Sequence, residues 1–197
     1  MFPQPDDTTP EYSADERRFL LKLAHEAIDA ALRHEDVDTT SPSEHLVEKR
    51  GAFTTLHWHG QLRGCVGYVF AVRPLVRTIA ETAVAAAFSD TRFPPVTAEE
   101  ARELEIEISV LSPLQPIAAD DVEVGRHGLV ITLGARRGLL LPQVPGEYGW
   151  DRETFLAETC HKAGLPADAW QHGATLEAFT AEVFGEAAHH TLQHKTA

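Results

Sequence analysis

The stretch GAFTTLHWHGQLRGCVGYVF, residues 51–70, decides the fold class. The part before His59-Gly60 is rich in aromatic and β-favouring residues, this dipeptide supplies a turn, and the part after it forms a return strand. The sequence therefore predicts a β-hairpin. Its return strand contains Gly64 and Gly67. Because glycine weakens the interior of a strand, two glycines there indicate a bulge or a close approach by another backbone or a ligand.

Helical patterns lie on both sides of this hairpin. The segment Ser13-Ala14-Asp15-Glu16 is a capping box, and the apolar spacing that follows it predicts a helix to about Leu32. A second helix is expected from Pro74 to Phe88, with small residues that permit tight packing against a sheet. A third helix is expected between a cap at Asp151 and a terminating Gly164.

The remaining strands set the fold class. They are expected at residues 106–110, in a hairpin of 129–133 with 139–141, and at 178–184, and a short helix is expected at 97–103. Neighbouring strands are joined by short turns, which favours antiparallel or mixed pairing. The predicted class is therefore α+β, with a mixed or mainly antiparallel sheet and packed helices.

The length of 197 residues suits one domain, or one domain with two lobes. Residues 1–12 are polar and rich in proline, and we expect them to form a mobile tail. The domain itself is expected to span residues 13–185. A second mobile tail, residues 186–197, carries His189, His190 and His194.

Composition excludes several classes of function. The net charge of -13, from 17 Lys and Arg against 30 Asp and Glu, disfavours general nucleic-acid binding. No apolar run is long enough to span a bilayer, and the amino terminus lacks the pattern of a signal peptide. The two cysteines, Cys65 and Cys160, form neither a disulfide framework nor a C-x-x-C pair. We therefore expect a cytoplasmic protein with two free thiols and no membrane association.

Cys65 is the first candidate for chemistry. In a regular strand Arg63 and Cys65 would project from the same face, and a guanidinium beside a thiol favours the thiolate, which is a nucleophile or a soft metal ligand. Gly64 and Gly67 would then leave room for a substrate. In the other interpretation, Arg63 pairs with a carboxylate elsewhere and Cys65 fills a tight core site. The local sequence leaves both interpretations open.

A loop and a helix end carry the other candidates. Asp90, Arg92 and Phe93 lie in a stiff loop after a buried helix, a common place for binding groups, although Asp90 could instead cap the helix or pair with Arg92. Lys162 stands at the end of the last helix, where it could bind a substrate or the terminal carbonyls. Cys160 falls on the inward side of that helix, and we expect it in the core.

No metal site is predicted. His57 and His59 share a strand face, but they flank a turn and no third ligand accompanies them, so we interpret them as solvated. Known nucleotide-binding, metalloprotease and serine-hydrolase motifs are missing from the sequence, and no cofactor is assigned.

Distinctive blocks of sequence follow one another at residues 51–56, 62–67, 90–96, 107–114, 128–131, 140–144, 149–150 and 162–166. In these blocks the chain resembles the AMMECR family, and the resemblance covers about Glu16 to Phe184. The family usually has Ile in place of Val66 and often Pro in place of Thr91.

The resemblance implies a two-lobed α+β fold with residues 62–67 near a cleft between the lobes. It also implies a component of an AmmeMemoRadiSam-type system, encoded beside a Memo-like protein and a radical S-adenosylmethionine enzyme, without an established reaction. Our leading hypothesis is a component that binds a substrate or partner at Cys65 and Arg63, with thiol chemistry at Cys65 and with Asp90 and Arg92 as orienting groups. The alternative is a non-catalytic interaction module in which residues 62–67 are a packing device.

Overall fold

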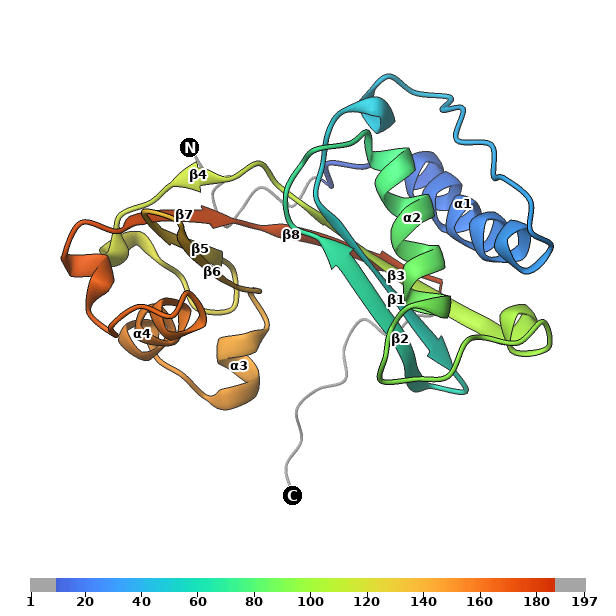
Figure 1. The fold of residues 1–197 in the computed structure, drawn as a ribbon. Helices are drawn as coiled ribbons and strands as arrows, with labels where there is room; N and C mark the ends of the chain where they lie inside the picture. Colours follow the sequence, from blue (N-terminus) through green and yellow to red (C-terminus); the bar gives the residue numbers. More distant parts are fainter. Residues whose placement is uncertain (1–9, 187–197) are drawn as a thin grey trace. The chain divides into compact units, whose positions relative to one another are not determined.

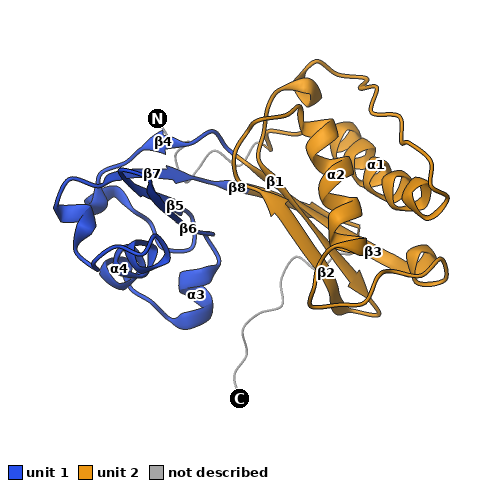
Figure 2. Cartoon of the chain, viewed as in Figure 1, with its two compact units in different colours: residues 1–8, 112–181 blue, residues 9–111, 182–197 orange. Residues whose placement is uncertain are grey.

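The computed structural model describes residues 10–186. The chain forms two compact units, each with its own four-stranded sheet (Figure 2). Unit 1 contains the described residues 112–181, and unit 2 contains the described residues 10–111 and 182–186. Unit 2 is therefore completed by the segment that follows unit 1 in the sequence. Helices and antiparallel strand pairs occur in both units, which confirms the α+β class.

In unit 2 the strand order is β2-β1-β3-β8, and β1 pairs antiparallel with both β2 and β3. The predicted hairpin of residues 51–70 and the two predicted helices are confirmed. Both helices lie on one face of this sheet (Figure 1), where α2 packs on β1 and β2. The elements are α1 (Ala14–Leu32), η1 (His45–Val47), β1 (Ala52–Trp58), β2 (Gln61–Tyr68), α2 (Leu75–Phe88), η2 (Glu100–Glu103), β3 (Leu104–Leu111) and β8 (Ala181–Gly185).

Local signals in the sequence account for the ends of these elements. Ser13 begins α1 with the predicted capping box: its N–H donates to the Glu16 carboxylate at 2.9 Å, and the Glu16 N–H donates to the Ser13 hydroxyl at 3.3 Å. Alternate residues of the strands face the helices, so Leu56, Ile106 and Ile108 are buried in one core with the inner sides of α1 and α2.

In unit 1 the strand order is β4-β7-β5-β6. Asp151 caps α4 as predicted, because its carboxylate accepts the Thr154 N–H at 2.8 Å. Phe155 and Leu156 of α4 are buried against this sheet. The elements are β4 (Gln115–Pro116), η3 (Ala119–Asp121), β5 (Gly128–Leu133), β6 (Arg136–Leu140), α3 (Val144–Tyr148), α4 (Arg152–Lys162), η4 (Ala169–Gln171) and β7 (Thr175–Phe179).

The strand predicted at 178–184 is wrong in one respect. It consists of two strands, β7 and β8, which belong to different sheets and are separated at Thr180. The Thr180 N–H donates to the Ser112 hydroxyl at 2.9 Å. Both residues lie where the chain passes from one unit to the other. The continuous β-favouring sequence therefore does not show that the chain changes sheets.

Described residues at the borders of the two expected tails make defined contacts. Tyr12 is 1% exposed and stacks on the ring of His45, with 4.6 Å between ring centroids, so Tyr12 is packed into unit 2. Glu186 accepts the N–H of Ile106 at 3.0 Å and lies 2.8 Å from His25. Residues 1–9 and 187–197 of the expected tails lie outside the described residues. None of the helices in the described part of the chain is long and apolar enough to cross a membrane.

Candidate functional site

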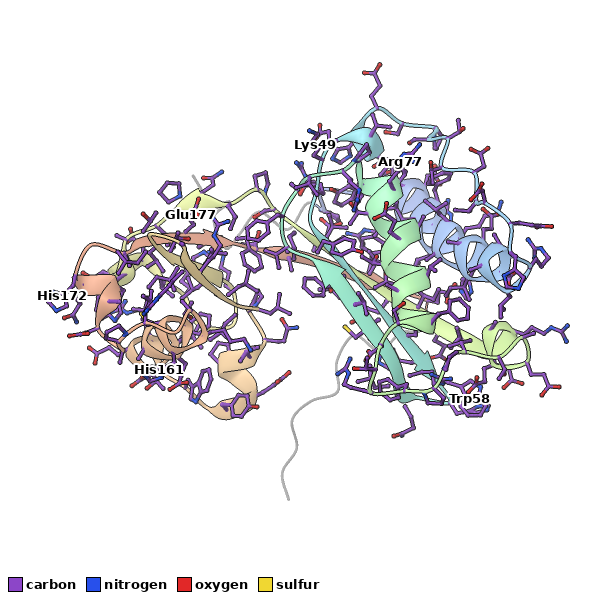
Figure 3. The ribbon with its side chains drawn as sticks, viewed as in Figure 1. Lys49, Trp58, Arg77, His161, His172 and Glu177 are labelled. Carbon is purple, nitrogen blue, oxygen red and sulfur yellow. The ribbon has the colours of Figure 1, made fainter. Side chains whose placement is uncertain are left out.

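The strand that carries the candidate cysteine contains a bulge. Trp58, which ends β1 beside the turn (Figure 3), pairs with Gln61, but Leu56 pairs with Gly64 and His57 with Leu62. One residue of β2, Arg63, is therefore left without a partner on β1. The bulge expected from the two glycines is present. It also removes the basis for placing Arg63 and Cys65 on one face, because strict alternation holds only in a regular strand.

Arg63 is held by a carboxylate. Its Nε donates to Glu100 Oε1 at 3.0 Å, and its Nη2 donates to Glu100 Oε2 at 3.1 Å and to the carbonyl of Pro95 at 3.3 Å. Arg63 is 7% exposed, and its hydrogen bonds lower the pKa of Glu100. The predicted role of Arg63 as activator of Cys65 is thus not supported by its contacts. Its guanidinium instead fixes Glu100, which also accepts the N–H of Thr97 at 2.8 Å.

The two glycines are packed against the chain itself. A Cβ added at Gly64 would lie 2.2 Å from the carbonyl oxygen of Ala86 in α2. A Cβ added at Gly67 would lie 2.2 Å from the ring of Phe53 in β1. The close approach predicted for Gly64 is therefore to a backbone and that for Gly67 is to a side chain. The space beside them is filled rather than available to a substrate.

Cys65 lies on the face of the sheet opposite the helices, since its neighbour Gly64 faces α2. It is a partly exposed free thiol. Thr55 stands directly across from it on β1, and the Thr55 hydroxyl donates to Cys65 Sγ at 3.2 Å. Cys65 is therefore neither a fully buried core residue nor a free surface group.

The loop after α2 holds the backbone of Cys65 at both of its polar groups. The Cys65 N–H donates to Asp90 Oδ2 at 2.9 Å, and Arg92 Nη2 donates to the Cys65 carbonyl at 3.3 Å. Arg92 also binds Asp90 through Nε at 2.9 Å and Nη2 at 2.6 Å. We call this arrangement of Asp90 and Arg92 on Cys65 the clip. It brings together three of the residues that the sequence analysis singled out.

Electrostatics and packing hold the clip together. The Arg92 guanidinium, helped by the Cys65 N–H, lowers the pKa of Asp90 well below the usual carboxyl range even though burial acts in the opposite direction. The Asp90 side chain is 6% exposed, whereas that of Arg92 is 56% exposed. Phe93 supports Arg92, whose Cζ lies 5.4 Å from the centre of the Phe93 ring.

Lys162 and Cys160 belong to α4 of unit 1, whereas Cys65 and the clip belong to unit 2. Lys162 is exposed, and the nearby carbonyl of Gly164 accepts a hydrogen bond from Arg136 at 2.8 Å. Cys160 is fully buried, as predicted, and burial raises the pKa of its thiol. Next to it, His161 (Figure 3) lies 3.1 Å from Glu158.

The two histidines that flank the hairpin turn differ in their surroundings. His59 is exposed and lies 3.2 Å from Glu103, while His57 is partly exposed. Among residues 10–186, no group of three or more His, Cys, Asp or Glu side chains is arranged to hold a metal ion.

Sequence reasoning missed Thr55 and Glu100. In a regular hairpin, the pairing of Trp58 with Gln61 would place Thr54 across from Cys65, whereas the bulge shifts the register by one residue and brings Thr55 there. For Glu100 a signal was present, because the capping box that begins at Thr97 contains it. Nothing in that local pattern indicates that the same carboxylate also binds Arg63.

The family follows from a match between the AMMECR1 family model and residues 21–184. The chain belongs to the AMMECR1 family. Protein TK0174 of Thermococcus kodakarensis is 45% identical over 183 residues, which cover 85% of this chain and 89% of that protein. Protein MJ0810 of Methanocaldococcus jannaschii is 42% identical over 182 residues, covering 87% and 90%.

A solved structure supports the same assignment. The crystal structure of the uncharacterized protein PH0010 from Pyrococcus horikoshii matches with a TM-score of 0.73 and 42% identity, and it covers 85% of this chain and 90% of that chain. The fold is therefore that of the AMMECR1 family. The names of these relatives state no reaction, so the family membership establishes the fold and not the chemistry.

Proposed function

We propose that this AMMECR1-family chain is a binding component of a multi-protein system and that it contacts its substrate or partner at the surface around Cys65. In this proposal the Cys65 thiol acts as a nucleophile or as a thiolate ligand. The clip is the observation that carries the proposal. It fixes both backbone polar groups of Cys65 while leaving the Arg92 guanidinium 56% exposed beside it.

The cation at this site is Arg92 rather than Arg63. An exposed guanidinium next to a thiol stabilises negative charge there, and it also offers donors to a carboxylate or phosphate of a ligand. Arg92 is held beside Cys65 by its hydrogen bond to the Cys65 carbonyl at 3.3 Å. We therefore assign orientation to Asp90, ligand contact to Arg92 and Phe93, and reactivity to Cys65.

Several observations favour the alternative, a non-catalytic interaction module in which residues 62–67 serve packing. Gly64 and Gly67 are packed against α2 and β1, and Arg63 is paired with Glu100. Within the described residues, the hydrogen bond to Cys65 Sγ comes from a threonine hydroxyl rather than from an acid or a base. In this alternative a partner binds the same surface without reaction at the thiol.

The family resemblance suggests the system in which this component acts. We propose partners of the AmmeMemoRadiSam type, a Memo-like protein and a radical S-adenosylmethionine enzyme, in the cytoplasm. Two cysteines that are both free thiols support a reducing compartment. The acidic net charge of -13 supports protein partners rather than nucleic acid.

Binding to purified candidate partners tests the proposal. Titration calorimetry would compare the native chain with Cys65→Ser and Arg92→Gln, with Arg73→Gln as a control at an exposed ion pair on the same unit. We expect both site variants to weaken binding at least about tenfold, equivalent to about 1.4 kcal/mol, and the control to bind normally. Loss of binding in Arg92→Gln with full binding in Cys65→Ser would favour the interaction module. Equal binding by all variants would contradict a contact at this surface.

A further inference from the structure

The strand that carries Cys65 lies at an edge of its sheet. The order of unit 2 is β2-β1-β3-β8, so among the described strands β2 pairs on one side only. An exposed edge strand presents unpaired N–H and C=O groups and can add a strand from another chain. Either a strand of another chain binds along the outer edge of β2, or a feature of this protein prevents such binding.

The polar groups of Cys65 point toward that outer edge. In an antiparallel pair, successive residues direct their N–H and C=O groups alternately toward the partner strand and away from it. Both groups of Cys65 bond to the loop after α2 rather than to Thr55, the residue opposite on β1. An added strand would pair with these same two groups.

The clip occupies the positions that the backbone of an added strand would take. A neighbouring strand offers a carbonyl to accept the N–H and an N–H to donate to the carbonyl. Asp90 accepts the Cys65 N–H at 2.9 Å, and Arg92 donates to the Cys65 carbonyl at 3.3 Å. The clip is also tied together internally, because the Arg92 N–H donates to Asp90 Oδ1 at 3.2 Å and the Phe93 N–H to the Asp90 carbonyl at 3.1 Å.

Without the clip, this edge would suit a second copy of the same chain. An antiparallel pairing centred on Cys65 would relate the two copies of β2 by a two-fold axis, so each copy would offer the other the same N–H and C=O groups. Leu62 and Tyr68, near the two ends of β2, are 42% and 38% exposed, and the bulge places their side chains on opposite faces of the sheet. Like charges would not oppose the pairing along the strand, because the guanidinium of Arg63 is bound to Glu100.

We propose that the Asp90–Arg92 clip closes the outer edge of β2 against strand addition, and that the partner it keeps off is a second copy of this chain paired through β2. The inference does not depend on the function proposed above, because it concerns the backbone of Cys65 and not its thiol. It gives the buried Asp90 a role in keeping the surface around Cys65 free of a second copy.

Removal of the clip tests the inference. The variant Asp90→Ser/Arg92→Ser is compared with Arg73→Ser/Glu81→Ser, which removes an exposed ion pair of 2.8 Å between Arg73, before α2, and Glu81 of α2 in the same unit. Sedimentation equilibrium at high salt, which screens the net charge, measures self-association of the full chain. We expect the native chain and the control to form no dimer through unit 2. The dissociation constant of the dimer should be at least about tenfold lower for the clip variant than for either of them.

Two further variants establish that β2 is the interface. Adding Tyr68→Lys to the clip variant places a charge on the edge and should restore the monomer. In the dimer, diamide, which accepts the electrons and protons of two thiols, should link Cys65 to Cys65, because facing residues with a Cα separation of about 5.5 Å are within disulfide reach. If the clip variant does not fold, Arg92→Ser alone, which keeps the bond from Cys65 to Asp90, should give a smaller shift toward dimer.

Several outcomes would overturn the inference. A folded clip variant that associates no more than the control would show that the clip does not guard this edge. The same conclusion would follow from a dimer that Tyr68→Lys does not dissociate, or from an Arg92→Ser protein that stays fully monomeric when the double variant cannot be obtained. Cross-links that map to Cys160 would likewise contradict pairing through β2.

Discussion

Gly64 of β2 and Ala86 of α2 are in direct backbone contact: a Cβ at position 64 would lie 2.2 Å from the Ala86 carbonyl oxygen. The helix therefore packs on the hairpin at a distance that only glycine permits. The Gly64 position supports the fold, and the neighbouring Cys65 is held in place as a result.

Gly64→Ala should destabilise the protein by about 1–3 kcal/mol, because α2 must move to admit the Cβ, and Gly64→Val should cost more. Gly146→Ala is a suitable control, since a Cβ there meets nothing within 4 Å and the backbone is helical. That change should be neutral or slightly stabilising. Denaturant midpoints measure all three variants. A neutral Gly64→Val would show that the contact with Ala86 does not constrain this position.

Ser13→Ala should lower stability by about 1 kcal/mol, because it removes the acceptor for the first free N–H groups of α1. Chemical unfolding of the variant and of Ser89→Ala provides the comparison. Ser89 is an exposed residue that follows α2, and its N–H donates to the Ala85 carbonyl. Equal stability of both variants would mean that the capping box contributes little to this helix.

Glu16 gives the capping box a dependence on pH. Its hydrogen bond from the Ser13 N–H, followed by side-chain bonds from Ser43, Ser13 and His45, lowers the pKa of Glu16 from 4.5 to about 2, against the effect of burial. A lowered pKa means that the stabilisation is present above about pH 4.5 and is lost as the pH falls toward 2. The free energy of unfolding of the native chain should therefore fall more steeply over this range than that of Glu16→Gln. Parallel curves would contradict this assignment.

Arg63→Met should destabilise unit 2 by about 3 kcal/mol, because Glu100 would be left partly buried without its cation. The double change Arg63→Met/Glu100→Met should recover most of that loss, since it removes both charges. In the folded fraction of Arg63→Met, the alkylation rate of Cys65 should be unchanged. A marked change in that rate would return Arg63 to a role at the thiol.

The sequence predicts best those features that depend on contacts between residues close to one another in the chain. The box of Ser13 and Glu16, the turn at His59-Gly60 and the cap at Asp151 involve neighbouring residues, and all three form as predicted. The tails were predicted from polar composition alone, which does not reveal that Tyr12 is buried against His45.

The features that escaped prediction depend on contacts between distant residues. Arg63 binds Glu100, which is 37 residues away, and Gly64 contacts Ala86. The two glycines indicate a bulge, but the strand sequence reveals neither its position at Arg63 nor the direction of the Arg63 side chain. The loop residues Asp90 and Arg92 were recognised as binding groups. That they bind the backbone of Cys65 follows only from the packing of α2 on the hairpin.

The site at which the native protein is alkylated tests the proposed thiol chemistry at Cys65. A sub-stoichiometric amount of iodoacetamide is added to the folded chain, and the adduct is mapped by mass spectrometry. We expect the adduct at Cys65, which is partly exposed and held by the clip, and we expect Cys160, which is fully buried, to react only after unfolding. Faster labelling of Cys160, or no labelling of either thiol until the protein is denatured, would contradict the proposed thiol chemistry and leave the interaction module as the function of this surface.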